Sequence, residues 1–174
     1  MKIYCVFLLL LLCLVACATT ETMQMQAPRT PDYLPSGEAA RTLTVTNAAP
    51  VPATIVVLTQ AVAIKETGPK ETVQRFGEVY AFAPAFFAVH RDEPTLIRFW
   101  NLQPDDEHDF MLFDPHNNVL MKVTFPPLRE TAYVFTFHEE GLFTFICPMH
   151  RPEMNGQILV LPPVTDQSTH DLNR

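Results

Sequence analysis

The sequence predicts an all-β protein, a single-domain Greek-key β-sandwich or barrel. The 174 residues include 16 prolines and 5 glycines, a composition that suits strands, turns and loops better than long helices. Short runs of alternating apolar and polar residues recur, and turn residues separate them about every 8 to 12 positions, as in sandwiches and barrels. No stretch has the apolar spacing of a long amphipathic helix, and no internal repeat is present.

Each expected strand follows from its local pattern. "RTLTVTN" alternates apolar residues with threonines, and in "TLIRFWN" Ile97 and Phe99 share one face while Arg98 takes the other. Pro84 interrupts "EVYAFAPAFFAV", as expected at a sheet edge or a bend. The expected strands lie at residues 41–47, 53–65, 78–89, 95–101, 109–114, 119–125, 132–138, 142–147 and 156–161.

The order of these strands predicts that two distant residues meet. His108 precedes the strand "DFMLFD", and the chain then makes four passes before it reaches Cys147. An even number of passes returns the chain to the end of the sandwich from which it started. Alternation also places Phe143, Phe145 and Cys147 on one inward-facing side of their strand. We therefore expect the Cys147 sulfur at the same end as His108, sheltered by aromatic rings.

The N-terminus resembles the export signal of a bacterial lipoprotein. A single cation, Lys2, precedes a nearly continuous apolar run over residues 3–18, and the run ends in "LVAC" at Cys17. The resemblance implies that residues 1–16 are removed and that Cys17 carries lipid, which anchors the protein to a membrane. The run is marginal in length for a permanent membrane span, the alternative interpretation. Ala18 after the cysteine favours the outer membrane of a Gram-negative bacterium, facing the periplasm.

Cysteine usage then leaves one thiol to explain. Cys5 and Cys13 belong to the signal and Cys17 carries lipid, so Cys147 is the remaining free thiol of the exported form. An exported protein meets an oxidising environment, in which a lone thiol is either buried and inert or bound to a ligand.

The chain divides into four parts by composition. Residues 1–16 form the signal, 17–40 a lipidated cysteine with a polar, proline-bearing flexible linker, 41–163 the folded domain, and 164–174 a disordered tail. The segment 42–75 is longer than a minimal sandwich of this kind needs, and the sequence assigns it no role.

The charge of the chain limits its partners. The formal net charge is −7, and loss of residues 1–16 removes only Lys2, which gives −8. An acidic surface argues against nucleic acid and against polybasic binding to anionic lipid. It favours a basic protein partner.

One short stretch collects soft metal ligands. "FICPMHRPEMNG" holds Cys147, His150 and Met154, and His108 joins them through the strand order. Two histidines, one cysteine and a weak axial methionine are the ligand set of a blue-copper electron-transfer site. Met149 is the rival axial ligand, but it lies too near Cys147 in sequence to swing over the metal readily.

The segments around these residues resemble the cupredoxin family, which includes plastocyanin, pseudoazurin and amicyanin. The match covers residues 76–161 and rests on "YAFAPAFFAVHRDEPTLIRFWN", "EHDFMLFD" and "GLFTFICPMHRPEMNGQILV". The resemblance implies one type 1 copper ion held by His108, Cys147, His150 and Met154. It also marks a departure: the family often has Asn after its first histidine, and here Asp109 occupies that position, where it either tunes the metal or caps a turn.

Other histidines and methionines have plainer interpretations. His90, His116 and His138 lie in turn-like stretches and are expected in solvent, while Met111 and Met121 alternate with apolar neighbours and are expected in the core.

The expected function is electron transfer rather than catalysis. A membrane-tethered carrier would cycle Cu(II)/Cu(I) between extracytoplasmic redox partners, such as a c-type cytochrome or a membrane oxidoreductase, and the acidic run 105–107 is a possible docking patch. The alternative is a copper chaperone or sequestration protein, because "CPMHRPEM" also resembles motifs of copper and silver efflux proteins. Multicopper enzymes need His-x-His pairs and a two-copper site needs a second loop cysteine; the sequence contains neither.

Overall fold

The computed structural model describes residues 30–48 and 53–164, which form a sandwich of two five-stranded sheets. The sandwich lies within the compact unit Pro31–Arg174. Its elements, in chain order, are α2 (Ala39–Thr42), β1 (Leu43–Asn47), β2 (Ala53–Ala63), α3 (Lys70–Phe76), β3 (Val79–Ala83), β4 (Phe86–His90), β5 (Thr95–Asn101), β6 (His108–Phe113), β7 (Val119–Phe125), β8 (Glu130–Phe137), β9 (Gly141–Ile146) and β10 (Asn155–Leu161).

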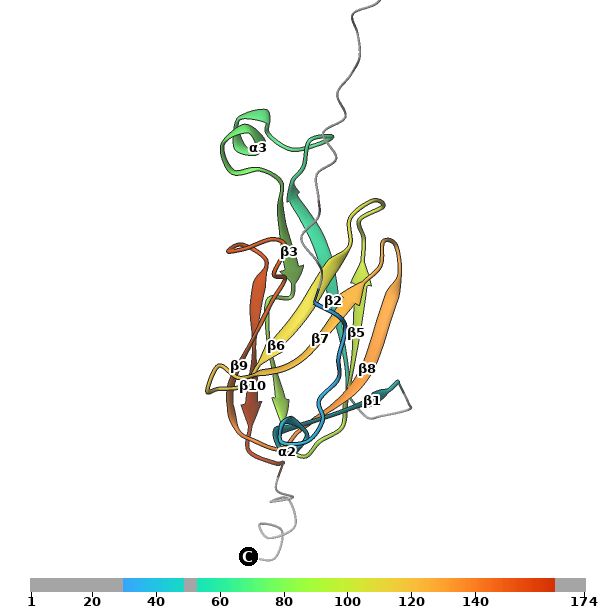
Figure 1. Ribbon diagram of the computed structural model, residues 1–174, viewed down its shortest axis with the longest axis vertical. Helices are drawn as coiled ribbons and strands as arrows, with labels where there is room; N and C mark the ends of the chain where they lie inside the picture. The colour runs from blue at the N-terminus through green and yellow to red at the C-terminus, as the bar shows by residue number, and fades with distance from the viewer. Residues whose placement is uncertain (1–29, 49–52, 165–174) are drawn as a thin grey trace, which may run out of the picture. The chain divides into compact units, whose positions relative to one another are not determined.

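Both sheets are mixed. The first has the order β1-β8-β5-β2-β3 and the second β4-β10-β9-β6-β7. Only the pairs β2–β5 and β10–β4 run parallel among the pairings of these strands. Figure 1 shows the strands running between two ends of the sandwich, with the turns gathered at those ends. The expected all-β sandwich is thus confirmed.

The register brings His108 and Cys147 to one end. β6 and β9 are antiparallel neighbours, with Met111 opposite Ile146, so the start of β6 lies beside the end of β9. We call this end the His108 pole; it is the upper end in Figure 1, where the β9–β10 loop lies. The prediction from counting strand passes is confirmed, because β6, β7, β8 and β9 alternate in direction.

An aromatic core fills the space between the sheets. Alternate residues of each strand point inward, and the inward positions hold large side chains that exclude water. The ring of Phe99, for example, contacts the rings of Phe110, Phe125 and Phe135. The buried phenylalanines are Phe82, Phe99, Phe110, Phe125, Phe135, Phe137, Phe143 and Phe145.

The expected strand at 78–89 is two strands in different sheets. β3 ends at Ala83 and β4 begins at Phe86, with Pro84 between them. Proline lacks a backbone N–H for the ladder, so it falls where the chain leaves one sheet for the other. The bend expected at Pro84 is present.

The region 42–75 also has a defined structure where it is described. It contributes β1 and β2 to the first sheet, and α3 lies in the connection from β2 to β3. Figure 1 shows α3 at the end of this extended hairpin. The hairpin is closed by an ion pair of 3.6 Å between Lys65 and Glu78.

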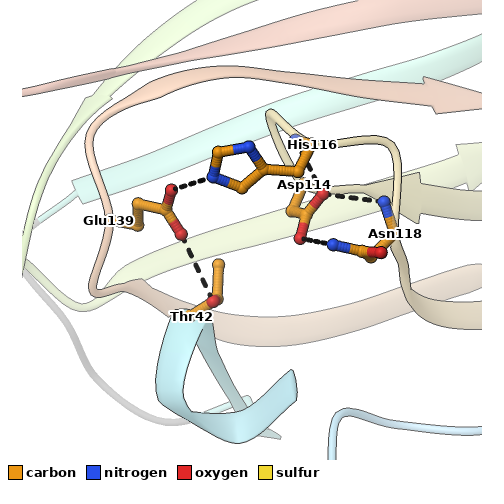
Figure 2. A network of polar contacts seen from close by, with 5 residues as sticks. All are labelled: Thr42, Asp114, His116, Asn118 and Glu139. Atoms are coloured by element: carbon orange, nitrogen blue, oxygen red, sulfur yellow. Dashed lines mark hydrogen bonds and ion pairs between the residues drawn. The ribbon is translucent and has the colours of Figure 1, made fainter. Parts of the chain in front are cut away.

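A polar network holds the turns at the opposite pole (Figure 2). The Glu139 carboxylate lies 3.2 Å from His116 Nε2 and accepts a hydrogen bond from the Thr42 hydroxyl at 3.4 Å. Asp114 accepts hydrogen bonds from the backbone N–H groups of His116 and Asn118. Burial favours the neutral form of Asp114, but a hydrogen bond from the Asn118 side-chain amide and these two backbone hydrogen bonds outweigh it and lower the pKa of the carboxyl. The network joins α2 to the β6–β7 and β8–β9 turns.

Several expectations about the termini fall on residues that are not described. The signal 1–16, Cys17 and most of the tail 164–174 lie outside the described ranges. Within the expected linker 17–40, residues 30–40 are described, and Tyr33 pairs with Lys122 of β7. In the described part of the chain, no helix is both long and apolar enough to cross a membrane.

Candidate metal centre

Three of the predicted ligands meet at the His108 pole. His108 is the first residue of β6, Cys147 follows β9 directly, and His150 lies in the loop between β9 and β10. One potential ligand atom from each of these residues lies within 4.8 Å of the other two. The structure therefore assembles a nitrogen–nitrogen–sulfur cluster from two separate parts of the chain.

The donor atoms face one another. His108 Nδ1 lies 3.2 Å from His150 Nδ1, and Cys147 Sγ lies 3.4 Å from His150 Nδ1. His108 and Cys147 are fully buried, whereas His150 is half-buried and reaches toward the surface. The cluster thus combines a sheltered sulfur with one imidazole that has an accessible edge.

Burial keeps both imidazoles neutral. It lowers the pKa of His108 to about 4, and repulsion from His150 adds to the effect. Burial also lowers the pKa of His150. A neutral imidazole keeps a nitrogen lone pair for a metal ion, so both rings are ready to act as ligands at neutral pH.

Burial has the opposite effect on the thiol. It raises the pKa of Cys147, which favours the neutral thiol in the metal-free protein. A metal ion that binds here must displace that proton, so affinity rises with pH.

Backbone hydrogen bonds shape the ligand loop. The N–H of Cys147 donates to the Met154 carbonyl at 2.8 Å, and the N–H of His150 donates to the Cys147 carbonyl at 3.1 Å. The N–H of Met154 donates to the His150 carbonyl at 2.9 Å. Met154 is completely buried, whereas Met149 is 39% exposed. These backbone hydrogen bonds hold the loop that carries Cys147, His150 and Met154.

Asp109 is bound to the centre through its backbone. Its N–H donates to Cys147 Sγ at 3.3 Å. Its carboxylate accepts a hydrogen bond of 3.0 Å from Thr124 and lies 3.2 Å from Lys122 Nζ. The side chain is therefore half of a buried ion pair, an arrangement that neither of the two sequence interpretations included.

Tyr80 completes the centre and was not singled out from the sequence. Its ring lies against both imidazoles, with centroid distances of 4.9 Å to His108 and 4.5 Å to His150. Its hydroxyl donates a hydrogen bond to Asp106, which also holds Asn101 through its backbone carbonyl. One acid of the expected docking patch is thus a structural partner of the centre. The only sequence signal was the aromatic alternation of the strand that contains Tyr80.

The remaining candidates lie away from the cluster. His138 and His116 are exposed, and each pairs with a carboxylate, while the half-buried His90 contacts the carbonyl of Pro162. Met121 is buried in the core as expected, and Met111 is half-buried.

The donor set fits copper. Two imidazole nitrogens and one thiolate in a closed group, with a buried methionine in the same loop, match the ligands of a type 1 copper ion. The β-sandwich and this donor set are the fold and the site that the sequence resemblance implied.

Comparison with solved structures gives cupredoxins. Auracyanin A, described as a "blue" copper protein from Chloroflexus aurantiacus, is 19% identical and has a TM-score of 0.45; the match covers 63% of this chain and 99% of that one. The auracyanin of Roseiflexus castenholzii is 15% identical and has a TM-score of 0.48; the match covers 65% of this chain and 100% of that one. Amicyanin from Paracoccus versutus is 18% identical and has a TM-score of 0.43; the match covers 69% of this chain and 98% of that one. No protein-family model and no curated protein matches the chain.

Proposed function

We propose that this protein is a mononuclear copper electron carrier that cycles between Cu(II) and Cu(I) and has no substrate of its own. The observation that supports this is the donor cluster, in which a ligand atom from each of His108, His150 and Cys147 lies within 4.8 Å of the other two. A site that changes little between oxidation states needs little reorganisation, which favours fast outer-sphere electron transfer.

The residues of the centre take distinct roles in this proposal. His108 and Cys147 are buried ligands from two neighbouring strands, and the half-buried His150 gives electrons a route to the surface. Met154 would be the weak fourth ligand, because it is completely buried in the same loop whereas Met149 is 39% exposed. Tyr80 packs against both imidazoles and holds their planes in place.

The partners that we propose are redox proteins, either a c-type cytochrome or a membrane oxidoreductase. Asp105 is exposed and Glu107 half-exposed in the loop before His108, so they place negative charge near the electron exit. A partner with a basic surface complements this charge and the net charge of −7.

We further propose that the protein is exported and held by a lipid on Cys17 at the periplasmic face of the outer membrane of a Gram-negative bacterium. The support is the sequence alone: the apolar run that ends in "LVAC", and Ala18 after the cysteine. Mass spectrometry of the membrane-extracted protein would show a diacyl-modified N-terminal Cys17. An unmodified N-terminus that retains residues 1–16 would contradict the anchor.

A copper chaperone or sequestration protein is the second candidate. Met149 supports it, because this side chain is exposed within two residues of Cys147 and offers a soft sulfur for handing a metal on.

The test is to add one equivalent of Cu(II) to the protein without its signal and record the visible and EPR spectra. An electron carrier gives an intense thiolate-to-copper band and narrow copper hyperfine splitting, both lost in Cys147→Ser. It also gives a reversible reduction potential. A colourless product that holds Cu(I) and exchanges it readily would favour the chaperone.

A matched pair of variants tests the axial ligand. Met154→Leu is expected to change the EPR spectrum and raise the reduction potential, because an apolar side chain replaces the weak sulfur ligand. Met149→Leu makes the same chemical change two residues after Cys147 and is expected to leave the EPR spectrum and the reduction potential unchanged. The reverse result would assign the axial position to Met149.

A further inference from the structure

The chain that precedes α2 covers an open sheet edge. We call residues 31–36 the N-terminal strap. The N–H of Tyr33 donates to the Lys122 carbonyl at 2.8 Å, and the N–H of Lys122 donates back to the Tyr33 carbonyl at 3.0 Å. β7 is the last strand of its sheet, so this edge would otherwise present unpaired backbone groups. Figure 1 shows the blue start of the described chain passing over β7 toward α2.

The strap also brings a charge to a buried ion pair. Lys122 Nζ lies 3.2 Å from Asp109 Oδ1 and 3.5 Å from Asp32 Oδ1. The Thr124 hydroxyl lies 2.9 Å from Asp32 Oδ1 and 3.0 Å from Asp109 Oδ1. One ammonium group is thus held between two carboxylates, one from β6 and one from the strap.

Because Lys122 is buried, the Asp32 carboxylate helps to stabilise its positive charge. The side chains of Lys122 and Asp109 are 3% and 4% exposed, whereas that of Asp32 is 52% exposed. Within the described structure, Lys122 Nζ makes ion pairs but no well-directed hydrogen bond. A buried ammonium that lacks hydrogen bonds depends on its neighbouring charges to offset the loss of water.

The ion pair is connected to the metal centre through Asp109. Asp109 follows His108 in β6, and its backbone N–H donates to Cys147 Sγ at 3.3 Å. A side chain that is held on the outer face of β6 also holds the Asp109 backbone, whose N–H reaches the sulfur of Cys147 after the neighbouring strand β9. Strand alternation explains this division, since His108 and Phe110 face the core while Asp109 faces Lys122 and Thr124.

We propose that the N-terminal strap is part of the metal centre, with Asp32 and Lys122 as positioning residues that hold the Asp109 amide against the Cys147 sulfur. The inference rests on the proposed copper site for its consequence, but the docking of the strap belongs to the metal-free protein as well. When the strap leaves β7, water reaches the ion pair, and the hydrogen bond to the sulfur loosens.

The test compares Asp32→Lys with Glu38→Lys. Both variants reverse one charge shortly before or at the start of α2, but only the first places a cation against Lys122. In the metal-free protein, backbone amide exchange is measured by NMR at Lys122 and Asp109. Asp32→Lys is expected to speed exchange at both amides by tenfold or more, and Glu38→Lys to leave both unchanged. If Asp32→Lys does not fold, Asp32→Asn, with Glu38→Gln as its control, gives the same comparison with a smaller effect.

Faster exchange at Lys122 with unchanged exchange at Asp109 would overturn the proposal, because the strap would then be a cover for the edge and nothing more. Equal exchange in the Asp32 and Glu38 variants would also overturn it. In the copper-loaded protein, the thiolate-to-copper band is expected to shift in Asp32→Lys and to stay in place in Glu38→Lys. Absence of that band in the unaltered protein would overturn the copper function, while the amide exchange would still decide the role of the strap.

Discussion

At the scale of single residues, the centre depends on two imidazoles that stay neutral because they are buried together. His108 is the deeper of the two, and its ring lies against both His150 and Tyr80, which also contact each other. Protonation of His108 would place a positive charge in a site that excludes water and faces a second base. The same arrangement that offers lone pairs to a metal therefore makes the metal-free protein sensitive to acid.

The pH dependence of stability follows from this. The pKa of His108 is lowered from 6.5 to about 4, so between these values the unfolded chain binds a proton that the folded chain does not. Stability therefore rises with pH across this window and is lost as pH falls. The metal-free protein is expected to lose about 3 kcal/mol of unfolding free energy from this group between pH 7 and pH 4.

Urea unfolding of the metal-free protein at several pH values measures this loss. His108→Gln is expected to flatten the profile, and His116→Gln, which changes an exposed histidine, is expected to leave it as it was. Parallel profiles for the unaltered protein and His108→Gln would show that His108 does not carry the acid sensitivity.

At the scale of elements, the ligand loop is held by the strands on either side of it. β9 leads to Cys147, and β10 begins at Asn155 immediately after Met154. The two strands pair along their length, with Gly156 opposite Phe145. Gly156 lies so close to its neighbours that an added Cβ would come within 2.3 Å of the Phe145 ring and 2.5 Å of the Ala85 carbonyl oxygen.

Gly156→Ala is expected to destabilise the protein by about 1 to 3 kcal/mol, because the new methyl group forces β10 away from Phe145. Gln157→Ala changes an exposed residue of the same strand and is expected to stay within about 0.5 kcal/mol of the unaltered protein. Chemical denaturation of the metal-free forms measures both. Equal stability of the two variants would mean that the strands shift apart without cost.

At the scale of the whole molecule, charge and position favour a docking face at the His108 pole. The chain carries a formal charge of −7, and Asp105 is exposed in the loop that leads to His108. The opposite pole also carries acids, including the exposed Glu140. In the proposed function, net charge would attract a basic partner to the whole molecule, and the acids at the His108 pole would favour the orientation that transfers electrons.

The rate constant for reduction of the copper-loaded protein by a basic c-type cytochrome is expected to fall about tenfold between about 0.01 M and 0.15 M salt, since salt shortens the range of the attraction. Stopped-flow measurements give this rate. At low salt, Asp105→Asn is expected to slow the reaction more than Glu140→Gln, which removes the same charge at the far pole. Equal effects of the two variants would indicate steering by net charge alone.

The sequence by itself determined the fold class and the meeting of His108, Cys147 and His150 at one end of the sandwich. Alternation in the strands buried Phe143, Phe145 and Cys147 on one side, and the count of strand passes brought His108 to the same end. Both inferences hold because strand periodicity and strand direction are local properties that can be followed along the chain. The ligand types in the loop after β9 then suggested copper through their chemistry.

Only the tertiary structure decided what surrounds those ligands. Tyr80 contacts both imidazoles from β3, which belongs to the first sheet, whereas β6 and β9 belong to the second. Asp32 contacts Lys122 from a segment whose composition predicts a linker. These contacts join residues that are far apart in sequence and have no shared period or motif. They depend on how the two sheets pack and on where the N-terminal strap crosses the edge of β7, and these are properties of the assembled sandwich rather than of any one segment.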